Sequence, residues 1–506
     1  MPVYLDMEEV WDVAVLGSGL GGLSSALSVA HAGDSVLILE KGISPGGCAS
    51  SFHKSGYVFE SGATTLVGLE PNYPMDYLCK KFGVNFPVLQ LPIPMVVRLD
   101  GQDLVRYEDP SEWISEVKRV FGKPKRQTLF WRFLFFLSKN VWDLSSRYRK
   151  FPFSEMKDIG KTLFVFSFKD LIPLVLSFIP IRYFLFIFGL FGDKRFTKFL
   201  DEQLLITCQS MTADTPTPMA AAGLTYPNLK NYYVLGGMIS LSNTIIERIQ
   251  TISSKNQILY KQEVLEIQKV EREGQGKIWE IRTKHRENNV FYAKEIISNL
   301  PIWNLANILK SNKARSVANR FEKKIWGAFT MGVAIRWKDA TYPSVLHYQI
   351  HLEEPLPYGG GSSVFVSLSH PQDKIRSSHG SLVLSISTHI EDPDVWIRDE
   401  NYQKKKGEIE ERILQALSKN LNWFERSLIL FKHGATPITW KTWTGRKSGR
   451  VGGIPSFYYL NPFRYIPNRL DGIYLTGDTV YPGQGIPAVV LGGQLAAERY
   501  LERKRG

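Results

Sequence analysis

The chain has 506 residues and a net charge of +13, from 62 Lys and Arg against 49 Asp and Glu. Hydrophobic residues make up 44% and charged residues 22%, which is typical of a folded protein and excludes a disordered chain. This length exceeds what one hydrophobic core usually supports, so we expect two or more lobes. The cysteines, Cys48, Cys79 and Cys208, are too widely spaced for a disulfide scaffold or a CxxC metal site, and they fit a reducing compartment.

The N-terminal residues, MPVYLDMEEVW, are acidic where an export signal would be basic, and no apolar run precedes Trp11. We therefore expect a cytoplasmic protein.

A strand–turn–helix–strand unit follows. Residues 13–16 are a short apolar run typical of a strand buried on both faces, and Gly17, Gly19 and Gly22 come next as G-x-G-x-x-G. A helical pattern continues to Ala32, and SVLILE is the second strand. The glycines allow a tight turn, close approach of a pyrophosphate to the backbone, and packing of helix on strand. The unit predicts a Rossmann-like α/β fold that binds a dinucleotide at the helix N-terminus.

Further features of the sequence favour FAD over NAD. Glu40 closes the second strand where a carboxylate would bond ribose hydroxyls, and the glycine pair at 46–47 does not belong to the NAD motif. Near the C-terminus, GIYLTGD is typical of a strand ending at Gly477 and Asp478, followed by a glycine- and proline-rich loop and a helix from about Ala488. That helix N-terminus would face a flavin, and Asp478 would bond the ribityl chain or the pyrophosphate side. The cofactor domain is thus expected to combine segments from both ends of the chain.

The segment between these motifs predicts one helix, MISLSNTIIERIQ, and then three strands with polar turns across residues 257–301. No second dinucleotide fingerprint appears, because the glycine pairs at 236–237 and 492–493 lack a strand–turn–helix context. We therefore expect no NAD(P)H domain and an external electron acceptor, either oxygen or a quinone.

An apolar run, LIPLVLSFIPIRYFLFIFGLF, extends from Leu171 to Phe191 and carries one charge, Arg182. Its length would just span a bilayer, which takes about 20 apolar residues. Pro173 and Pro180 divide any helix, and an arginine at bilayer depth is costly, so a single span is disfavoured. A buried core segment and a surface that dips into a membrane both remain open.

A basic stretch precedes the apolar run. Residues 118–169 contain thirteen Lys and Arg against three Asp and Glu. Basic residues beside an apolar surface suit anionic lipid headgroups, whereas no nucleic-acid motif accompanies the charge. We expect a membrane surface as a partner, with the protein peripheral on the inner face, and no nucleic acid.

Five segments resemble the FAD-dependent carotenoid desaturase and carotenoid isomerase family, with the C-3',4' desaturase branch nearest and the phytoene desaturase type of fold. They are GSGLGG, LEKGISPGGCASSF, GYVFESGATTLVGLEP, TPITWKTWTGRKSGRVGGIP and LTGDTVYPGQGIPAVVLGGQLAAERY. The similarity covers most of the chain and is strongest in the first 70 and last 75 residues. One departure is Glu60, where relatives often have aspartate, which puts in doubt a role that depends on exact reach.

The resemblance implies an FAD-binding domain built from residues 1–95, 226–314 and 431–506, and a mixed α+β substrate lobe built from residues 96–225 and 315–430. It also implies FAD contacts at Gly17, Ser18, Gly19, Gly22, Glu40, Lys41, Gly46, Gly47, Val264 and Asp478, with Ile486 beneath the ring.

The implied activity is desaturation of a C40 carotenoid near its ψ-end, with hydride transfer to FAD. A carotene isomerase or a retinol-saturase-like reductase using reduced FAD would carry the same motifs. An amine oxidase would need an aromatic cage, and a non-enzymatic escort like the Rab-GDP dissociation inhibitors would lack the flavin motifs that are intact here. No catalytic residue and no metal site stands out; His53 and Cys48 are read as structural, and the Arg446–Arg450 loop as a closing loop.

Overall fold

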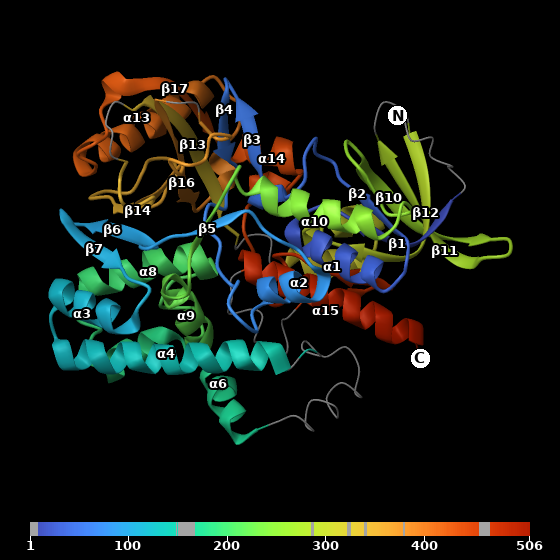
Figure 1. Ribbon diagram of the computed structural model, residues 1–506, viewed down its shortest axis with the longest axis horizontal. Helices are drawn as coiled ribbons and strands as arrows, with labels where there is room; N and C mark the ends of the chain where they lie inside the picture. Colours follow the sequence, from blue (N-terminus) through green and yellow to red (C-terminus); the bar gives the residue numbers. More distant parts are fainter. Residues whose placement is uncertain are drawn as a thin grey trace.

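The computed structural model describes residues 9–147, 149, 167–284, 288–320, 325–337, 342–377, 380–454 and 466–505. Two large β-sheets lie along the long axis of the molecule, one built around β1 and the other around β13 and β16 (Figure 1). Helices cover both sheets, and α3, α4 and α6 lie below the second sheet in this view. The mixed α/β architecture confirms the predicted fold class.

The first sheet has eight strands. Its parallel centre consists of β9, β2, β1, β12 and β19 in that order, and an antiparallel hairpin, β10–β11, pairs with the first half of β12. The strands are β1 (Val10–Leu16), β2 (Val36–Leu39), β9 (Gln257–Leu259), β10 (Glu263–Arg272), β11 (Gly276–Lys284), β12 (Asn288–Ser298), β18 (Arg469–Leu470) and β19 (Ile473–Leu475).

Helices sandwich this sheet because β1 is apolar on both faces. Val13 and Val15 contact one hydrophobic core, whereas Ala14 and Leu16 contact another. The first core is shared with α1 (Leu20–His31), α2 (Pro74–Phe82), α10 (Ile239–Ile252) and α15 (Ile486–Arg505). The second is shared with α11 (Ile302–Leu309) and α12 (Asn312–Asn319).

The predicted elements of this half are present, with two corrected ends. The strand before Gly477 ends at Leu475, and the C-terminal helix begins at Ile486 rather than near Ala488. The helix at 239–252 is confirmed. Residues 257–301 hold four strands rather than the predicted three, because QIL forms the separate strand β9, which pairs with β2.

The second sheet has seven strands in the order β17-β13-β16-β15-β14-β6-β7. They are β6 (Met95–Leu99), β7 (Gln102–Arg106), β13 (Gly327–Arg336), β14 (His347–His351), β15 (Ser363–Leu368), β16 (Ser381–Ile390) and β17 (Ile429–Ala435). One face contacts α13 (Tyr402–Asn420), and α3 (Pro110–Phe121), α4 (Pro124–Arg147), α8 (Lys194–Cys208) and α9 (Thr217–Leu224) form a further core below it. β17 extends across residue 430, where we expect a domain boundary; the boundaries stay a prediction.

Short elements connect the two halves. They are the hairpin β3 (Ser51–Lys54) and β4 (Tyr57–Glu60), the paired strands β5 (Val88–Gln90) and β8 (Tyr232–Val234), and α14 (Pro437–Thr444).

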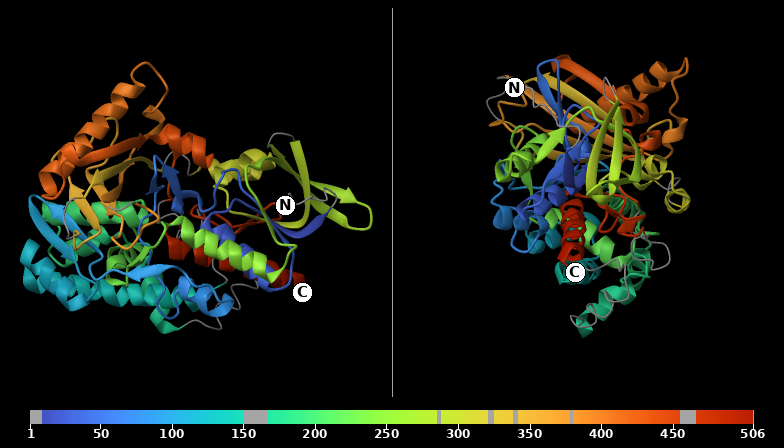
Figure 2. Two further views of the ribbon diagram at one scale, coloured as in Figure 1. Left: turned by 45° about the horizontal axis from the view of Figure 1, so that its top comes forward. Right: turned by 90° about the vertical axis from the view of Figure 1, so that its right-hand side faces the viewer.

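The apolar run forms two short helices, α6 (Leu171–Leu176) and α7 (Ile181–Ile187), separated at Pro180. α6 projects from the lower side of the molecule beside α4 (Figures 1 and 2). No helix within the described ranges is long and apolar enough to cross a membrane. Residues 150–166, which include part of the basic stretch, lie outside the described residues.

One face of this run is core and the other faces solvent. Ile181 and Leu185 are fully buried, and Phe184 stacks on Phe133 of α4 at 4.8 Å. In contrast, large side chains along both helices are 40–74% exposed: Leu171, Ile172, Leu174, Val175, Phe178, Tyr183, Phe186, Ile187 and Phe191. The interpretation as a wholly buried core segment is therefore wrong.

A buried ion pair ties the connecting hairpin to the second sheet. Glu60 at the end of β4 lies 3.1 Å from the guanidinium of Arg376, and both side chains are at most 3% exposed. Glu60 also accepts hydrogen bonds from the Ser51 hydroxyl and the Met238 amide, while Arg376 donates to the Ser385 hydroxyl of β16. The longer glutamate thus reaches partners on three separate segments.

We predict that Arg376→Met lowers the free energy of unfolding by about 3–5 kcal/mol, because the Glu60 carboxylate stays buried without its cation. Chemical denaturation followed by circular dichroism measures the change. The matched control, Lys419→Met, removes one partner of an exposed pair with Glu353 and should leave the midpoint nearly unchanged. Equal midpoints for the two variants would contradict this role of the buried pair.

Candidate active site

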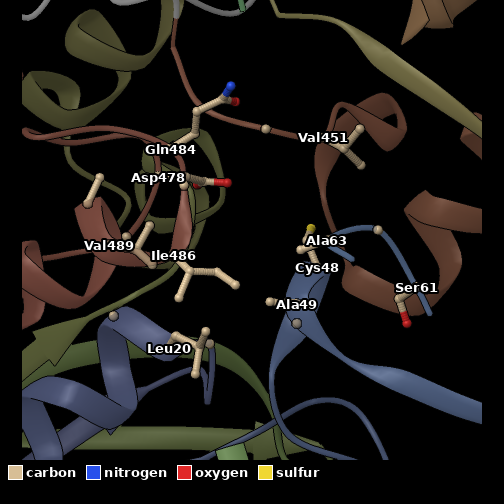
Figure 3. A pocket seen from close by; sticks show the side chains of 18 of the residues that line it. Leu20, Cys48, Ala49, Ser61, Ala63, Val451, Asp478, Gln484, Ile486 and Val489 are labelled. Atoms are coloured by element: carbon tan, nitrogen blue, oxygen red, sulfur yellow. The ribbon is translucent and has the colours of Figure 1, made fainter. Parts of the chain in front are cut away.

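A cavity of about 1950 Å³ lies between the two sheets and receives residues from both. Cavities for single small ligands are usually about 300–1,000 Å³. This space is therefore large enough for a dinucleotide and a second elongated ligand. Figure 3 shows part of its wall, with Asp478 and Ile486 on one side and Cys48 and Ala49 on the other.

The N-terminal glycines form one wall of the cavity where β1 turns into α1. Gly17 has a φ of +90°, which favours glycine, and a Cβ on Gly22 would lie 2.4 Å from the Gly17 carbonyl oxygen. Gly17 and Gly19 line the cavity, whereas Gly22 lies behind them and lets the helix approach the strand. The turn leaves backbone amides of the α1 N-terminus facing the cavity, as anion sites require.

Asn299, which immediately follows β12, occupies the space that three glycines leave. A Cβ on Gly19, Gly21 or Gly477 would lie within 2.5–2.9 Å of the Asn299 side chain. The backbone N–H of Asn299 donates to the Leu16 carbonyl at 2.9 Å, and this bond fixes Asn299 beside the end of β1. The glycine motifs from both ends of the chain therefore meet at one side chain that sequence patterns did not reveal.

The two helices that face the cavity also contact each other directly. A Cβ on Gly493 of α15 would lie 2.2 Å from the Gly21 carbonyl of α1, and the Ser24 hydroxyl donates to the Val490 carbonyl at 2.9 Å. Their N-termini consequently open onto the same space, with Leu20 and Ile486 both in its wall (Figure 3). Two helix N-termini at one site suit a ligand with negative charge or electron-rich edges.

Glu40 organises the loop at the far side of the glycine turn. Its carboxylate accepts from the Ser18 amide at 2.8 Å, the Ser18 hydroxyl at 2.6 Å and the Gly42 amide at 2.7 Å. Lys41 pairs with Glu263, next to Val264 in the cavity wall. A carboxylate has about four acceptor positions, so one remains for a ligand hydroxyl.

Arg446 and Asp478 form a buried pair in the cavity wall, 2.5 Å apart. Arg446 also donates to the Gly452 carbonyl at 3.1 Å and hydrogen-bonds Cys48. Burial raises the pKa of the Cys48 thiol, which agrees with its interpretation as a structural residue. The loop around Arg446 thus connects the glycine loop at 46–47 to the C-terminal motif, a contact that spacing alone did not predict.

The structure brings the predicted residues together. Those in the cavity wall are Gly17, Gly19, Glu40, Lys41, Gly46, Gly47, Val264, Asp478 and Ile486, while Ser18 and Gly22 lie just behind it. Their individual contacts with a cofactor stay a prediction.

The remainder of the cavity extends into the second half of the molecule. Residues of α6, including Pro173 and Leu174, lie in its wall, together with residues of α8, α9 and five strands of the second sheet. Burial lowers the pKa of two wall residues, His389 and His433, to about 4, so both are neutral at physiological pH. Across the described part of the chain, no cluster of His, Cys, Asp and Glu could hold a metal ion.

Comparisons with known proteins agree with this geometry. Residues 20–501 match the family of flavin-containing amine oxidoreductases. The chain is 26% identical to a chloroplastic prolycopene isomerase of Arabidopsis thaliana, across 97% of this chain and 83% of that protein. It is 24% identical to a neurosporene-forming phytoene desaturase of Rhodobacter capsulatus, across 96% of this chain and 93% of that protein. The resemblance to carotenoid desaturases and isomerases is thereby confirmed.

A solved structure of putrescine oxidase with bound putrescine shares the fold, with a TM-score of 0.63, 13% identity and coverage of 98% of this chain and 100% of that one. The glycine-lined cradle and the two helix N-termini fit FAD, the cofactor of this class. The chain therefore belongs to the flavin-containing amine oxidoreductase family and is an FAD-dependent oxidoreductase.

Proposed function

We propose that the protein oxidises a C40 carotenoid, removing two hydrogens from a CH–CH bond near the ψ-end of the polyene. The observation that carries this proposal is the single cavity that joins the cofactor cradle to an apolar, partly exposed helix, α6. A long hydrophobic substrate could enter there without crossing water. The names of the carotenoid-acting relatives support the same choice.

We propose which residues of the chain hold each part of FAD. The pyrophosphate would be held by the backbone amides after Gly17 and those of the glycine pair at 46–47. Glu40 would accept a hydrogen bond from a ribose hydroxyl, and the backbone near Val264 would contact the adenine. Asp478 would hold the ribityl chain, and the N-terminus of α15 at Ile486 would lie beneath the ring. Bound FAD supplies the hydride acceptor, and oxygen or a quinone would reoxidise it. Segments 1–95, 226–314 and 431–506 would form the cofactor domain, and 96–225 and 315–430 the substrate lobe.

The apolar walls have a chemical role in this proposal. Closing the polyene between α6, α8 and α9 keeps water from a carbocation left by hydride loss, which the conjugated chain delocalises. Loss of the neighbouring proton would then complete the double bond, and a weak acceptor in the cavity wall, such as the neutral imidazole of His433, would be sufficient. A strong protein base is then unnecessary, in agreement with the absence of a paired acid and base among the described wall residues of the second sheet.

We further propose that α6 and α7 insert into a membrane surface. Their exposed apolar side chains are accompanied by exposed basic residues on α4 and around α7: Lys125, Arg126, Arg132, Lys139, Arg182 and Lys194. Cationic side chains around an apolar surface suit an anionic bilayer, and long basic side chains can reach the headgroups from this position. The substrate dissolves in that bilayer.

A second candidate is a cis-trans isomerase or a polyene reductase that uses reduced FAD. The similarity to the prolycopene isomerase, whose alignment covers 97% of this chain, supports this second candidate. The same cradle and cavity would serve these reactions.

We predict that Gly19→Val abolishes FAD binding. A side chain there meets Asn299 and pushes the glycine turn out of the position that holds the pyrophosphate. Flavin content after gel filtration and acid precipitation measures the loss, which should exceed about 100-fold in affinity. Gly407→Ala, where a Cβ meets nothing within 4 Å, is the matched control and should retain full flavin. Normal occupancy in Gly19→Val would show that the pyrophosphate site is misplaced.

We predict that Val175→Ser, Phe186→Ser and Ile187→Ser together weaken binding to anionic liposomes at least tenfold, because each side chain contributes roughly 1.5–3 kcal/mol on burial. Co-sedimentation measures the affinity. The control changes three exposed apolar residues outside α4, α6 and α7: Val395, Ile397 and Leu430. High salt should weaken wild-type binding without eliminating it, since screening lengths fall to about 3 Å at 1 M. Similar losses in both triple variants would contradict insertion of this surface.

Expression in hosts that accumulate lycopene, neurosporene or γ-carotene separates the candidate reactions. A desaturase lowers the product mass by two hydrogens and shifts absorption to the red. An isomerase changes retention at constant mass, and a reductase raises the mass and shifts absorption to the blue. No change in any of these carotenes or in their hydroxyl and keto derivatives would refute the carotenoid assignment.

A further inference from the structure

The second sheet has one apolar face and one mixed face, which presents polar but no charged side chains to the cavity. In β13, Phe329, Met331 and Val333 belong to the core shared with α13, while Ala328 and Thr330 line the cavity. The other strands alternate in the same way, which places Ser363, Phe365, Ser387, His389, His433 and Ala435 in the cavity wall. A cavity built only for hydrocarbon would not need this alternation.

Three of these side chains lie on two neighbouring strands and form a polar strip, defined here as Thr330, Ser387 and His389. Thr330 pairs with Ser387 across β13 and β16, and Ala328 pairs with His389 two residues along the same ladder, on the same face of the sheet. All three line the cavity, and no described residue hydrogen-bonds the two hydroxyls or the imidazole. Their donors and acceptors are therefore available to a ligand.

The chemistry of the strip excludes a charged ligand group. β13, β15, β16 and β17 contribute no charged side chain to the described cavity wall. Burial keeps the His389 imidazole neutral by lowering its pKa to about 4. Of the other charged groups in the wall, Asp170 pairs with Arg147, Asp478 with Arg446 and Lys41 with Glu263. Lys54 has no ion pair among the described residues, but its charge acts on His433 and not on His389 of the strip. Neither an ammonium nor a carboxylate would find a counterion at the strip.

We propose that the polar strip is a specificity site for an uncharged oxygen function of the substrate, a hydroxyl or a carbonyl group on the polyene. This inference rests on the proposed function, because it assigns a substituent to the polyene in the cavity. Two hydroxyls and one neutral imidazole offer both donors and acceptors, as either group requires. A pure hydrocarbon would displace water from the strip and leave those groups without partners, which disfavours its binding.

The test compares three polyenes of equal length: an acyclic C40 carotene, its terminal alcohol and its terminal ketone. Each is supplied in liposomes to the FAD-loaded protein, and binding (quenching of flavin fluorescence) is measured separately from turnover (product chromatography). We expect the wild type to bind at least one oxygenated polyene tenfold or more tightly than the hydrocarbon. Thr330→Val, Ser387→Ala and His389→Phe should each reduce that preference about three- to tenfold, mainly through KM.

Phe365→Leu is the matched control, because Phe365 pairs with Ser387 and lines the cavity without a hydrogen-bonding group. It should alter the affinity for all three polyenes alike and keep their ratio. Flavin content and absorption are recorded for every variant as a check on folding. The wild-type comparison itself requires no substitution.

If the wild type binds the three polyenes equally tightly, the inference about the strip is overturned. The proposed function still stands in that case if any of the polyenes is converted. Selective binding without any conversion would support the strip and refute the proposed reaction. Strip variants could also change the flavin spectrum or reduction potential and leave the ratio of affinities for oxygenated and hydrocarbon polyenes unchanged. That result would overturn the inference, since the strip would then serve the cofactor.

Discussion

The close approach of α1 and α15 is the constraint on which the site depends. These helices come from opposite ends of the chain, and a Cβ at Gly493 would overlap the Gly21 carbonyl. Gly22 allows α1 the same proximity to the turn at Gly17. Because both contacts involve backbone atoms that cannot move aside, only glycine is compatible with them. The two helix N-termini consequently converge on one space, with Asn299 filling the gap between the glycine loops.

The rest of the molecule extends that space. The buried Glu60–Arg376 pair links the hairpin after the glycine loop to the second sheet, and one cavity is lined by residues of both parts. α6 lies in the cavity wall, on the side where residues 171–191 expose nine large apolar side chains. A site of this design connects a polar cradle for a dinucleotide to an apolar surface, which suits an insoluble substrate better than a soluble amine.

Local patterns in the sequence predicted the elements whose periodicity is strong. The apolar residues 13–16, the glycine spacing and the alternation across 257–301 led directly to β1, α1 and the β10–β12 strands. Sequence patterns did not identify Asn299, because its role depends on three glycines that are distant from it in the sequence. The Arg446–Asp478 pair and the polar strip likewise depend on tertiary contacts and on strand register, which periodicity does not specify.

The apolar run at 171–191 shows a different limit of prediction from composition. Its composition fitted both a core segment and an interfacial surface, while its two prolines and Arg182 disfavoured a membrane span. The ambiguity arose because exposed side chains such as Phe186 alternate with buried ones such as Leu185. Only the packing of α4 against this run separated its two faces. The exposed face then gave the membrane proposal its physical basis.

The most direct measurement of the central claim is the redox state of the flavin when carotene in liposomes is mixed anaerobically with the oxidised protein. We expect loss of the oxidised flavin absorption at a rate that follows carotene concentration in the bilayer, with recovery when an acceptor is added. A flavin that stays oxidised with every carotene, while the chemically reduced protein converts the same carotenes, would contradict hydride transfer from the polyene to FAD.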